Sequence, residues 1–424
     1  MTLSQLMGRA QAWAASRRVV VLGDRYGGAD ECREASEEIA ALMDSWRDLG
    51  FQVDVVPWEE AATLLDHPPA AVLPLLAWSY SETHATAASF CELLQSLREG
   101  GAQPRVDLQA ITWMMHKRYL LELQEAGLPV VPTAVLTDRT TDSAALRAAL
   151  RDLAPAAARN ADRDGVPCFV VKPAIGGGGT GVERMSEGEA AATGDIVSRL
   201  RERDLLLQPF LAHVRRRGEL SFVFVNGELL HVVRKEPNGW DARSSQPVTR
   251  LEHPPKQAMR TARRALAFAT RRCGEQPCQG QPIYMARVDL LPAAAEGESE
   301  GECGSEGGSE GGSEGGSESN GSSDCGDDDG GERVDGGDER GRCRWLVSEL
   351  ELGWPHLFLR VAASAGIASS EVARGLQRHL TRITPSLTPS LASSAVEYGS
   401  HQKRKHTESP GEGEPFAQET KRPG

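Results

Sequence analysis

The sequence is poor in aromatic residues and has no long apolar run. Aromatic side chains make up 5% of the 424 residues. The longest apolar stretch, 70–78, is about half of the roughly 18 to 20 residues that a membrane-spanning helix needs. The eight cysteines form no C-x-x-C pair, which argues against a zinc site and a disulfide framework. We therefore expect a cytoplasmic protein with reduced thiols and no membrane partner.

The chain also lacks the basic surface that binds nucleic acid. Its formal net charge is −13. Segment 296–339 has sixteen acidic residues and one arginine, a net of −15, so the remainder carries +2. A nucleic-acid partner is therefore not expected. The segment repeats the tetrapeptide GGSE and has almost no apolar residue to offset the entropy of ordering, so we expect 294–342 to be a disordered insertion.

Two basic features leave other locations open as alternatives. The first 23 residues contain three arginines and no acid, as an organelle transit peptide would, although 19–23 already has the pattern of a core strand. Residues 403–405, Lys-Arg-Lys, resemble a nuclear signal, but the favoured interpretation is a solvated basic cluster in a loose tail.

Strand and helix patterns alternate over the first 110 residues. Expected strands lie at 18–23, 52–57 and 71–77, and expected helices at 30–49 and 85–98. This alternation predicts a parallel α/β unit over 1–111. From Thr112 a further helix, which contains Lys117, is expected to run to Gly127.

The next part of the chain predicts an α+β arrangement with antiparallel sheets. Strand patterns occupy 169–173, 181–185, 205–211, 220–225, 228–234, 283–291 and 345–352, and helical patterns occupy 255–272 and 357–380. Asn226-Gly227 joins two of these strands with a strong hairpin signal. We divide this part into 112–203, which carries a glycine loop, and 204–383, interrupted by the insertion. Segment 384–424 is expected to be a disordered tail.

A run of glycines follows the strand that ends in Lys172-Pro173. Consecutive glycines let backbone N–H groups surround a phosphate, so we expect Ile175–Gly181 to form a flap over phosphates; a plain mobile loop is the alternative. Its G-x-G-x-x-G is not a dinucleotide fingerprint, because extended chain rather than a helix follows. A dinucleotide-dependent oxidoreductase therefore lacks support.

Lys172 stands at the end of an apolar strand, where an ammonium group is costly unless it meets an anion. That position favours a phosphate partner. The alternative is a rim lysine whose flexible stem reaches solvent.

Acidic residues cluster on the last two expected strands. Side chains two apart share a strand face, so Asp289 lies on the same face as Arg287, and Glu349 on the same face as Glu351. In an antiparallel pair with Pro292 opposite Leu346, Asp289 falls opposite Glu349. Three carboxylates on one face suit Mg2+ together with ATP phosphates. A solvated acidic face balanced by Arg287 is the alternative.

A basic cluster follows the hairpin. Arg234, Lys235 and Arg243 lie after it, and Glu219 opens its first strand. Arginine forks bind carboxylate or phosphoryl oxygens through two hydrogen bonds, so this cluster could clamp a substrate. A surface charge cluster is the alternative. No local signature of a Ser-His-Asp or Cys-His nucleophile is present.

Taken in order, these motifs resemble the ATP-grasp superfamily. They are Lys117 before GLPVVPT, VVKPAIGGGGTG, LLLQPFL, GELSFVFVNGELLHVVRK, RVD and ELE, within 113–359 but outside the insertion. AVLPLLAWSY, HKRYLLELQEAGLPVVPT and SELELGWPHLFL are most similar to the cycloserine-forming ATP-grasp ligase and its uncharacterised relatives. The resemblance implies an ATP-grasp fold, with a Rossmann-like N-terminal unit and two α+β subdomains that clasp ATP.

The resemblance also implies roles for individual residues. Those expected to bind ATP are Lys117, Lys172, Gly177, Gly178, Gly179, Thr180, Gln208, Pro209, Phe210, Leu211 and Glu219. Asp289, Glu349 and Glu351 would hold one or two Mg2+ ions. Arg234, Arg243 and Arg287 would steady the transferring phosphoryl group.

The implied activity is a ligation. Such enzymes phosphorylate a carboxylate or similar carbonyl oxygen and let an amine displace phosphate, which forms a C–N bond, in some cases a ring. Because 353–356 departs from the turn of close relatives, we expect a small amino-acid-like carboxylate or ureido compound rather than the cycloserine precursor. Relatives often dimerise, so a homodimer is one option. The alternative function is a non-catalytic nucleotide-binding module that uses its acidic loop for interactions.

Overall fold

The computed structural model describes residues 17–25, 33–103, 105–138, 141–161, 165–192, 194–237, 248–274, 282–294, 343–353, 355–364 and 369–383. Several predictions fall outside these residues: the possible transit segment before residue 17, Arg243, the insertion from residue 295 to 342, and the tail. None of the described helices combines the length and the apolar character that crossing a bilayer demands.

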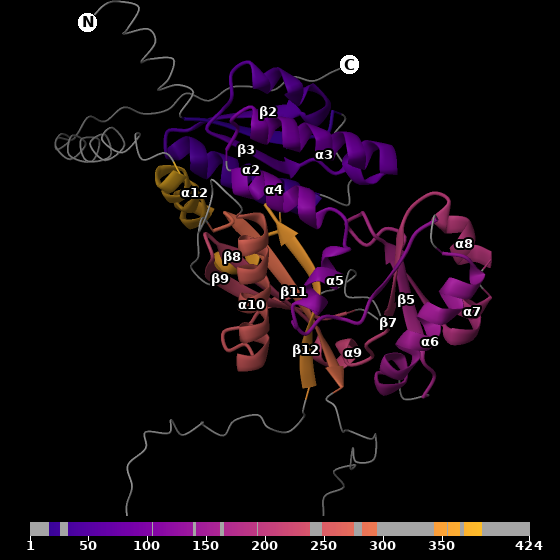
Figure 1. Cartoon of the computed structure of the whole chain (residues 1–424). Helices are drawn as coiled ribbons and strands as arrows, with labels where there is room; N and C mark the ends of the chain where they lie inside the picture. Colours follow the sequence, from indigo (N-terminus) through magenta and orange to yellow (C-terminus); the bar gives the residue numbers. More distant parts are fainter. Residues whose placement is uncertain are drawn as a thin grey trace, which may run out of the picture. The chain divides into compact units, whose positions relative to one another are not determined.

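The N-terminal unit, 17–103, is a parallel α/β unit, as the sequence predicts. Its sheet has the order β2-β1-β3, with both neighbours of β1 parallel to it. The strands are β1 (Arg18–Gly23), β2 (Gln52–Pro57) and β3 (Ala71–Leu76), and the helices are α2 (Arg33–Asp48), η2 (Trp58–Leu65), η3 (Ser79–Ser81) and α3 (His84–Glu99). β1 is buried from Val19 onward, and Leu42 and Trp46 of α2 and Phe90 of α3 are also buried. Figure 1 labels both helices in this unit.

The helix predicted from Thr112 to Gly127 is interrupted. α4 (Arg105–Met114) and α5 (Tyr119–Glu125) are separated by a turn that contains Lys117. The Lys117 amide donates to the carbonyl oxygen of Ala174 at 2.8 Å instead of continuing a helix. A hydrogen bond to the residue just before the glycine loop therefore replaces helical hydrogen bonding here, and the periodicity of 112–127 carries no information about that bond.

A four-stranded antiparallel sheet follows in the order β4-β7-β5-β6. Its strands are β4 (Ala134–Leu136), β5 (Cys168–Pro173), β6 (Glu183–Ser186) and β7 (Leu205–Pro209), with α6 (Ser143–Arg159), α7 (Glu187–Ala191) and α8 (Gly194–Leu200) around it. Leucines 146 and 150 of α6 pack with Phe169 and Leu207 in one core (Figure 1). The sheet thus fixes both ends of the glycine loop, which connects β5 to β6.

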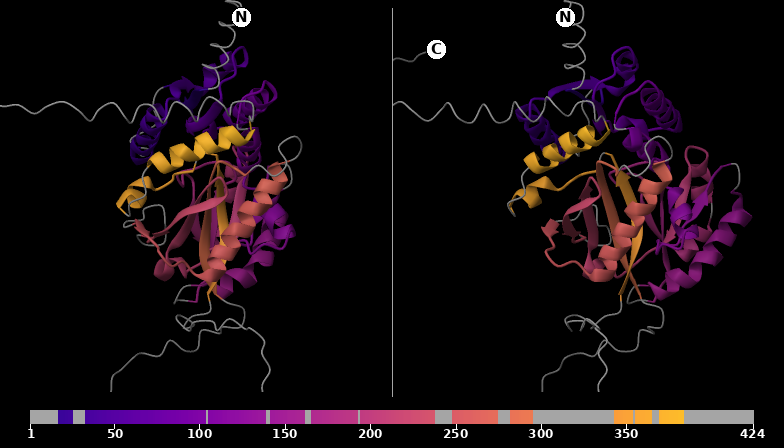
Figure 2. Two further views of the ribbon diagram at one scale, coloured as in Figure 1. Left: turned by 90° about the vertical axis from the view of Figure 1, so that its left-hand side faces the viewer. Right: turned by 60° about the vertical axis from the view of Figure 1, so that its left-hand side comes forward.

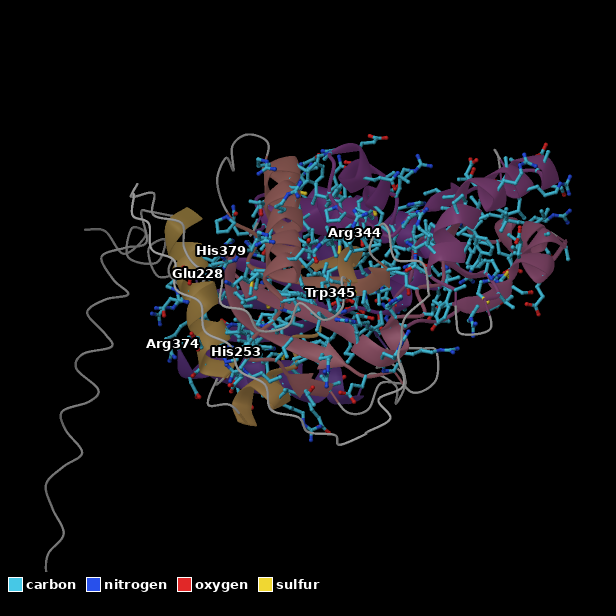
Figure 3. The ribbon with its side chains drawn as sticks, turned by 90° about the horizontal axis from the view of Figure 1, so that it is seen from below. Glu228, His253, Arg344, Trp345, Arg374 and His379 are labelled. Carbon is cyan, nitrogen blue, oxygen red and sulfur yellow. The ribbon has the colours of Figure 1, made fainter. Side chains whose placement is uncertain are left out.

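A five-stranded antiparallel sheet has the order β10-β9-β8-β11-β12. Its strands are β8 (Glu219–Val225), β9 (Glu228–Lys235), β10 (Val248–Arg250), β11 (Met285–Ala294) and β12 (Cys343–Leu352), and its helices are α9 (Val214–Arg217) and α10 (Lys256–Cys273). α10 lies along one face and buries Ala258, Ala262, Ala265 and Ala269 (Figure 2). In Figure 3, Arg344 and Trp345 mark the start of β12, where the Trp345 amide donates to Gln257 of α10 at 3.0 Å.

The pairing of β11 with β12 contains one irregularity. Asp289 lies opposite Glu349, as predicted, but Pro292 lies opposite Trp345 rather than Leu346. A β-bulge after Asp289 accounts for the one-residue shift, and the Ser348 hydroxyl donates to the Asp289 carbonyl oxygen at 3.0 Å there.

The helix predicted over 357–380 is two helices, α11 (Leu359–Ser364) and α12 (Ser369–Ile383). α12 packs through buried Val372, Leu376 and His379, and His379 pairs with Asn226 of the β8–β9 turn at 2.9 Å (Figure 3).

Candidate active site

Three cross-strand pairs place charged side chains on the face of the five-stranded sheet opposite α10. Glu219 of β8 lies opposite Lys235 of β9. On β11 and β12, Asp289 lies opposite Glu349, and Arg287 lies opposite Glu351. The alternate residues of β11, Val288 and Leu290, are buried on the apolar face. Alternation along neighbouring strands therefore builds one charged surface, here called the charged face.

Arg287 is the centre of the charged face. Its guanidinium is bidentate to Asp289, through Nε at 2.9 Å and Nη2 at 2.8 Å, and Nη2 also pairs with Glu351. Nη1 donates to the carbonyl oxygen of His356 at 3.2 Å. Burial opposes the charge of Arg287, but Asp289 and Glu351 outweigh it and raise the pKa of Arg287. The fork is thus fixed in place and stays cationic.

Asp289, Glu349 and Glu351 meet at one point. One carboxylate oxygen from each lies within 4.8 Å of the other two. Burial opposes ionisation of Asp289, yet Arg287 and Lys235 hold its pKa at about 2. Burial likewise opposes ionisation of Glu349, and Lys117 and Lys172 lower its pKa. Two of the three carboxylates are therefore held ionised by neighbouring cations.

Two lysines approach these carboxylates from the glycine-loop side. Lys117 Nζ lies 3.2 Å from Glu349 Oε1 and 2.6 Å from the carbonyl oxygen of Gly176. Lys172 has no ion pair or hydrogen bond from its ammonium group to any described residue, and burial lowers its pKa although Glu349 opposes the shift. A half-buried ammonium without a paired anion among the described residues lies where an anionic ligand would be favourable.

The basic pair after the hairpin divides between the two faces of the sheet. Lys235 pairs with Glu219 and lies 3.9 Å from Asp289 Oδ2. Burial disfavours its charge, but Asp289 and Glu219 raise its pKa. Arg234, the preceding residue, points to the other face and pairs with Glu236. The structure therefore brings Lys235 rather than Arg234 to the charged face, and its position opposite Glu219 is the sequence signal that identifies it.

The glycine loop, Ile175–Gly181, is open. Gly178 has φ +59° and Gly181 has φ +72°. A β-carbon added at Gly177 or Gly178 would meet nothing within 4 Å. The amides of Thr180 and Val182 turn back on Gly177 and Gly179 at 3.4 and 3.3 Å. The loop next to Lys117 and Lys172 thus has backbone freedom and free space.

The expected ATP-binding residues 208–211 begin in the last two positions of β7. Gln208 and Pro209 pair with β5, Gln208 Nε2 donates to Thr133 at 2.8 Å, and the Phe210 amide donates to Cys168. Arg184 lies over the Phe210 ring at 4.4 Å. Phe210 and Leu211 are buried. These four residues form a fixed connection between the two antiparallel sheets.

The donor set suits Mg2+ and a nucleotide. The charged face and the two lysines comprise four carboxylates and four cations: Glu219, Asp289, Glu349, Glu351, Lys117, Lys172, Lys235 and Arg287. Hard carboxylate oxygens are the ligands that Mg2+ prefers. The four carboxylates and four cations balance one another, and a triphosphate that binds together with Mg2+ brings negative and positive charge at once. The residues present therefore fit Mg2+ at the three carboxylates and phosphates beside the lysines.

Comparison with known proteins gives three results. No protein-family model matches the chain. Over 200 residues it is 28% identical to the cycloserine biosynthesis protein DcsG of Streptomyces lavendulae. The matched region is 47% of this chain and 62% of DcsG, so the chain spans less than two thirds of the length of this curated relative. The crystal structure of D-cycloserine synthetase DcsG superposes with a TM-score of 0.59 at 21% identity, covering 86% of this chain and 99% of the other.

A second solved structure has the same architecture. D-alanine–D-alanine ligase from Bacillus anthracis superposes with a TM-score of 0.51 at 12% identity, covering 88% of this chain and 99% of that one. At these identities the likeness concerns the fold. The chain therefore has the ATP-grasp fold, and part of it is similar in sequence to DcsG.

Proposed function

We propose that the protein is an ATP- and Mg2+-dependent ligase that activates a small amino-acid-like carboxylate or ureido carbonyl for attack by an amine. The observation that carries the proposal is the meeting of Asp289, Glu349 and Glu351 within 4.8 Å, with Lys117 bound to one of them. Similarity to a protein named for cycloserine biosynthesis supports a small amino-acid derivative as the substrate.

Each group has a role that follows from its contacts. Lys117 and Lys172 would bind phosphate oxygens, and Glu349 orients Lys117. Mg2+ at the three carboxylates would neutralise the charge of the phosphates. Arg287 and Lys235, held by Asp289, would stabilise the phosphoryl group as it moves to the carbonyl oxygen of the substrate. The glycine loop, once closed, would exclude water that competes with the amine.

This chemistry needs position and charge more than a nucleophilic side chain. Phosphoryl transfer depends mainly on alignment and on neutralising the equatorial oxygens. The amine then attacks the phosphorylated carbonyl carbon, so that a C–N bond forms as the C–O bond to the phosphoryl group breaks and inorganic phosphate is released. Whether that amine belongs to the same molecule decides between cyclisation and joining of two substrates.

A screen for Mg2+-dependent release of ADP tests the proposal. Amino acids and ureido compounds are offered with ATP to the full chain, to Glu349→Gln and to Glu228→Gln. Glu228 is an exposed glutamate at the far end of the same sheet and serves as the matched control (Figure 3). We expect turnover in the wild type and Glu228→Gln and a loss of about 100-fold in Glu349→Gln. Binding of Mg-ATP without turnover on any compound would favour the non-catalytic nucleotide-binding module.

A further inference from the structure

The segment after β12 touches the charged face and is held from the N-terminal unit. The His356 carbonyl oxygen accepts from Arg287 at 3.2 Å. The Phe358 ring lies 5.5 Å from the guanidinium carbon of Arg287 and 5.9 Å from Lys235 Nζ. The segment 356–359 therefore contacts both cations assigned to the phosphoryl group.

This segment has a backbone conformation that needs support. Phe358 has φ +53°, the left-handed region, which a bulky side chain rarely occupies. Such conformations persist only where the surroundings determine them, and they gather at functional sites. Glycine would adopt this φ at little energetic cost, but residue 358 is a phenylalanine, so contacts with its surroundings must stabilise the conformation.

Glu38 of α2 supplies those contacts. Its Oε1 accepts the amide of Leu357 at 2.7 Å, and its Oε2 accepts the amide of Leu359 at 2.7 Å. The two amides flank Phe358. Glu38 Oε2 also lies 3.4 Å from His356 Nε2, and the Glu38 side chain is 1% exposed. A buried carboxylate in the middle of a helix thus binds both sides of the strained residue.

We propose that Glu38 is a positioning residue for Arg287, which acts through the segment 356–359. The carboxylate holds Phe358 in its left-handed conformation, and that conformation sets the His356 carbonyl oxygen and the Phe358 ring against the guanidinium. The N-terminal unit would then take part in phosphoryl transfer without touching the nucleotide. The effect of Glu38 on phosphoryl transfer rests on the proposed function. The contact path from Glu38 through the segment 356–359 to Arg287 does not.

Glu38→Gln tests the proposal because the NH2 group of glutamine replaces one carboxylate oxygen. That group is a donor, so it cannot accept a hydrogen bond from the Leu357 or the Leu359 amide. Its matched control is Glu37→Gln, since Glu37 is the adjacent residue, exposed, and paired with Arg360 at 3.6 Å. We expect Glu38→Gln to lower kcat by at least about tenfold while KM for ATP changes by less than about twofold. Glu37→Gln should match the wild type. Equal kcat per folded molecule in both variants would overturn the proposal.

A double-mutant cycle separates positioning from general destabilisation. Glycine at 358 adopts φ +53° freely, so in a Phe358→Gly background Glu38→Gln should cost less than about threefold further in kcat. A merely structural Glu38 would give the same loss in both backgrounds. If the wild type shows no turnover, that result counts against the proposed ligase activity and not against the link between Glu38 and the segment 356–359. Hydrogen exchange at the Leu357 and Leu359 amides tests this link without any turnover. Faster exchange in Glu38→Gln than in Glu37→Gln supports the link; equal exchange refutes it.

Discussion

Lys235 and Arg234 are neighbours of the same charge on opposite faces of β9. Lys235 contacts Glu219 and approaches Asp289, whereas Arg234 pairs with Glu236. We expect Lys235→Met to lower kcat/KM for ATP-dependent ligation by about 100-fold, because a charge that stabilises the phosphoryl group is lost. Arg234→Met should leave that ratio nearly unchanged. Steady-state kinetics on the two variants checks this, and an equal loss in both would place the phosphoryl group elsewhere.

For single residues, the sequence correctly predicts which carboxylates meet on one face of the sheet, whereas their roles stay predictions. Asp289 and Glu349 fall opposite each other because strand alternation and pairing fix which side chains share a face. The same rule directs Arg234 away from that face, since Lys235, its neighbour on β9, is the residue paired with Glu219. The role expected for Arg234 stays a prediction. Glu38 carries no sequence signal, because its partners are backbone amides more than 300 positions away.

At the element scale, the glycine loop provides a matched pair of substitutions. Gly178 and Gly165 have φ +59° and +66°, and an added β-carbon at either would meet nothing within 4 Å. Alanine therefore costs about 1 kcal/mol of backbone strain at both. Only Gly178 belongs to the loop beside Lys117 and Lys172. We expect Gly178→Ala to raise KM for ATP by about tenfold and Gly165→Ala to leave it unchanged.

Thermal unfolding of both glycine variants provides the control, since equal strain should give equal shifts in Tm. If the two variants raise KM for ATP to the same extent, the loop does not cover phosphates.

Most elements are predictable because their patterns are local. The parallel strands β1 to β3 and the Asn226-Gly227 hairpin follow from composition and turn chemistry. The break between α4 and α5 is not predictable, because the bond from the Lys117 amide to Ala174 replaces helical hydrogen bonding from a distant part of the chain. The bulge after Asp289 is not predictable either; it lies beside Val347, whose backbone exchanges hydrogen bonds with Pro129 and Val131 from a distant part of the chain.

At the scale of the whole molecule, Asp107 of α4 links the N-terminal half to β11. It is 1% exposed, its Oδ1 accepts the Tyr284 amide at 2.9 Å, and its Oδ2 has no hydrogen-bond partner among the described residues. Burial raises its pKa to about 8 from 3.8, against the effect of the Tyr284 amide. Between these values the folded protein binds a proton that the unfolded chain has released, so stability falls as pH rises.

Asp107→Asn should remove this dependence. From pH 4 to 8 the free energy of unfolding of the wild type should fall, relative to the variant, by up to about 1.4 kcal/mol per pH unit. Urea titrations across this range measure the difference. Asp152→Asn, at an exposed position of α6, is the control and should follow the wild type. Parallel curves for wild type and Asp107→Asn would show that Asp107 is ionised in the folded state.

Calorimetry with a non-hydrolysable ATP analogue measures whether Mg2+ and the charged face together bind a nucleoside triphosphate. The titration is done with and without Mg2+, on the wild type and on Asp289→Asn. We predict binding by the wild type that weakens at least about tenfold without Mg2+, and no such Mg2+ dependence in Asp289→Asn. Equal affinity under all four conditions, or no binding by the wild type, would contradict the account.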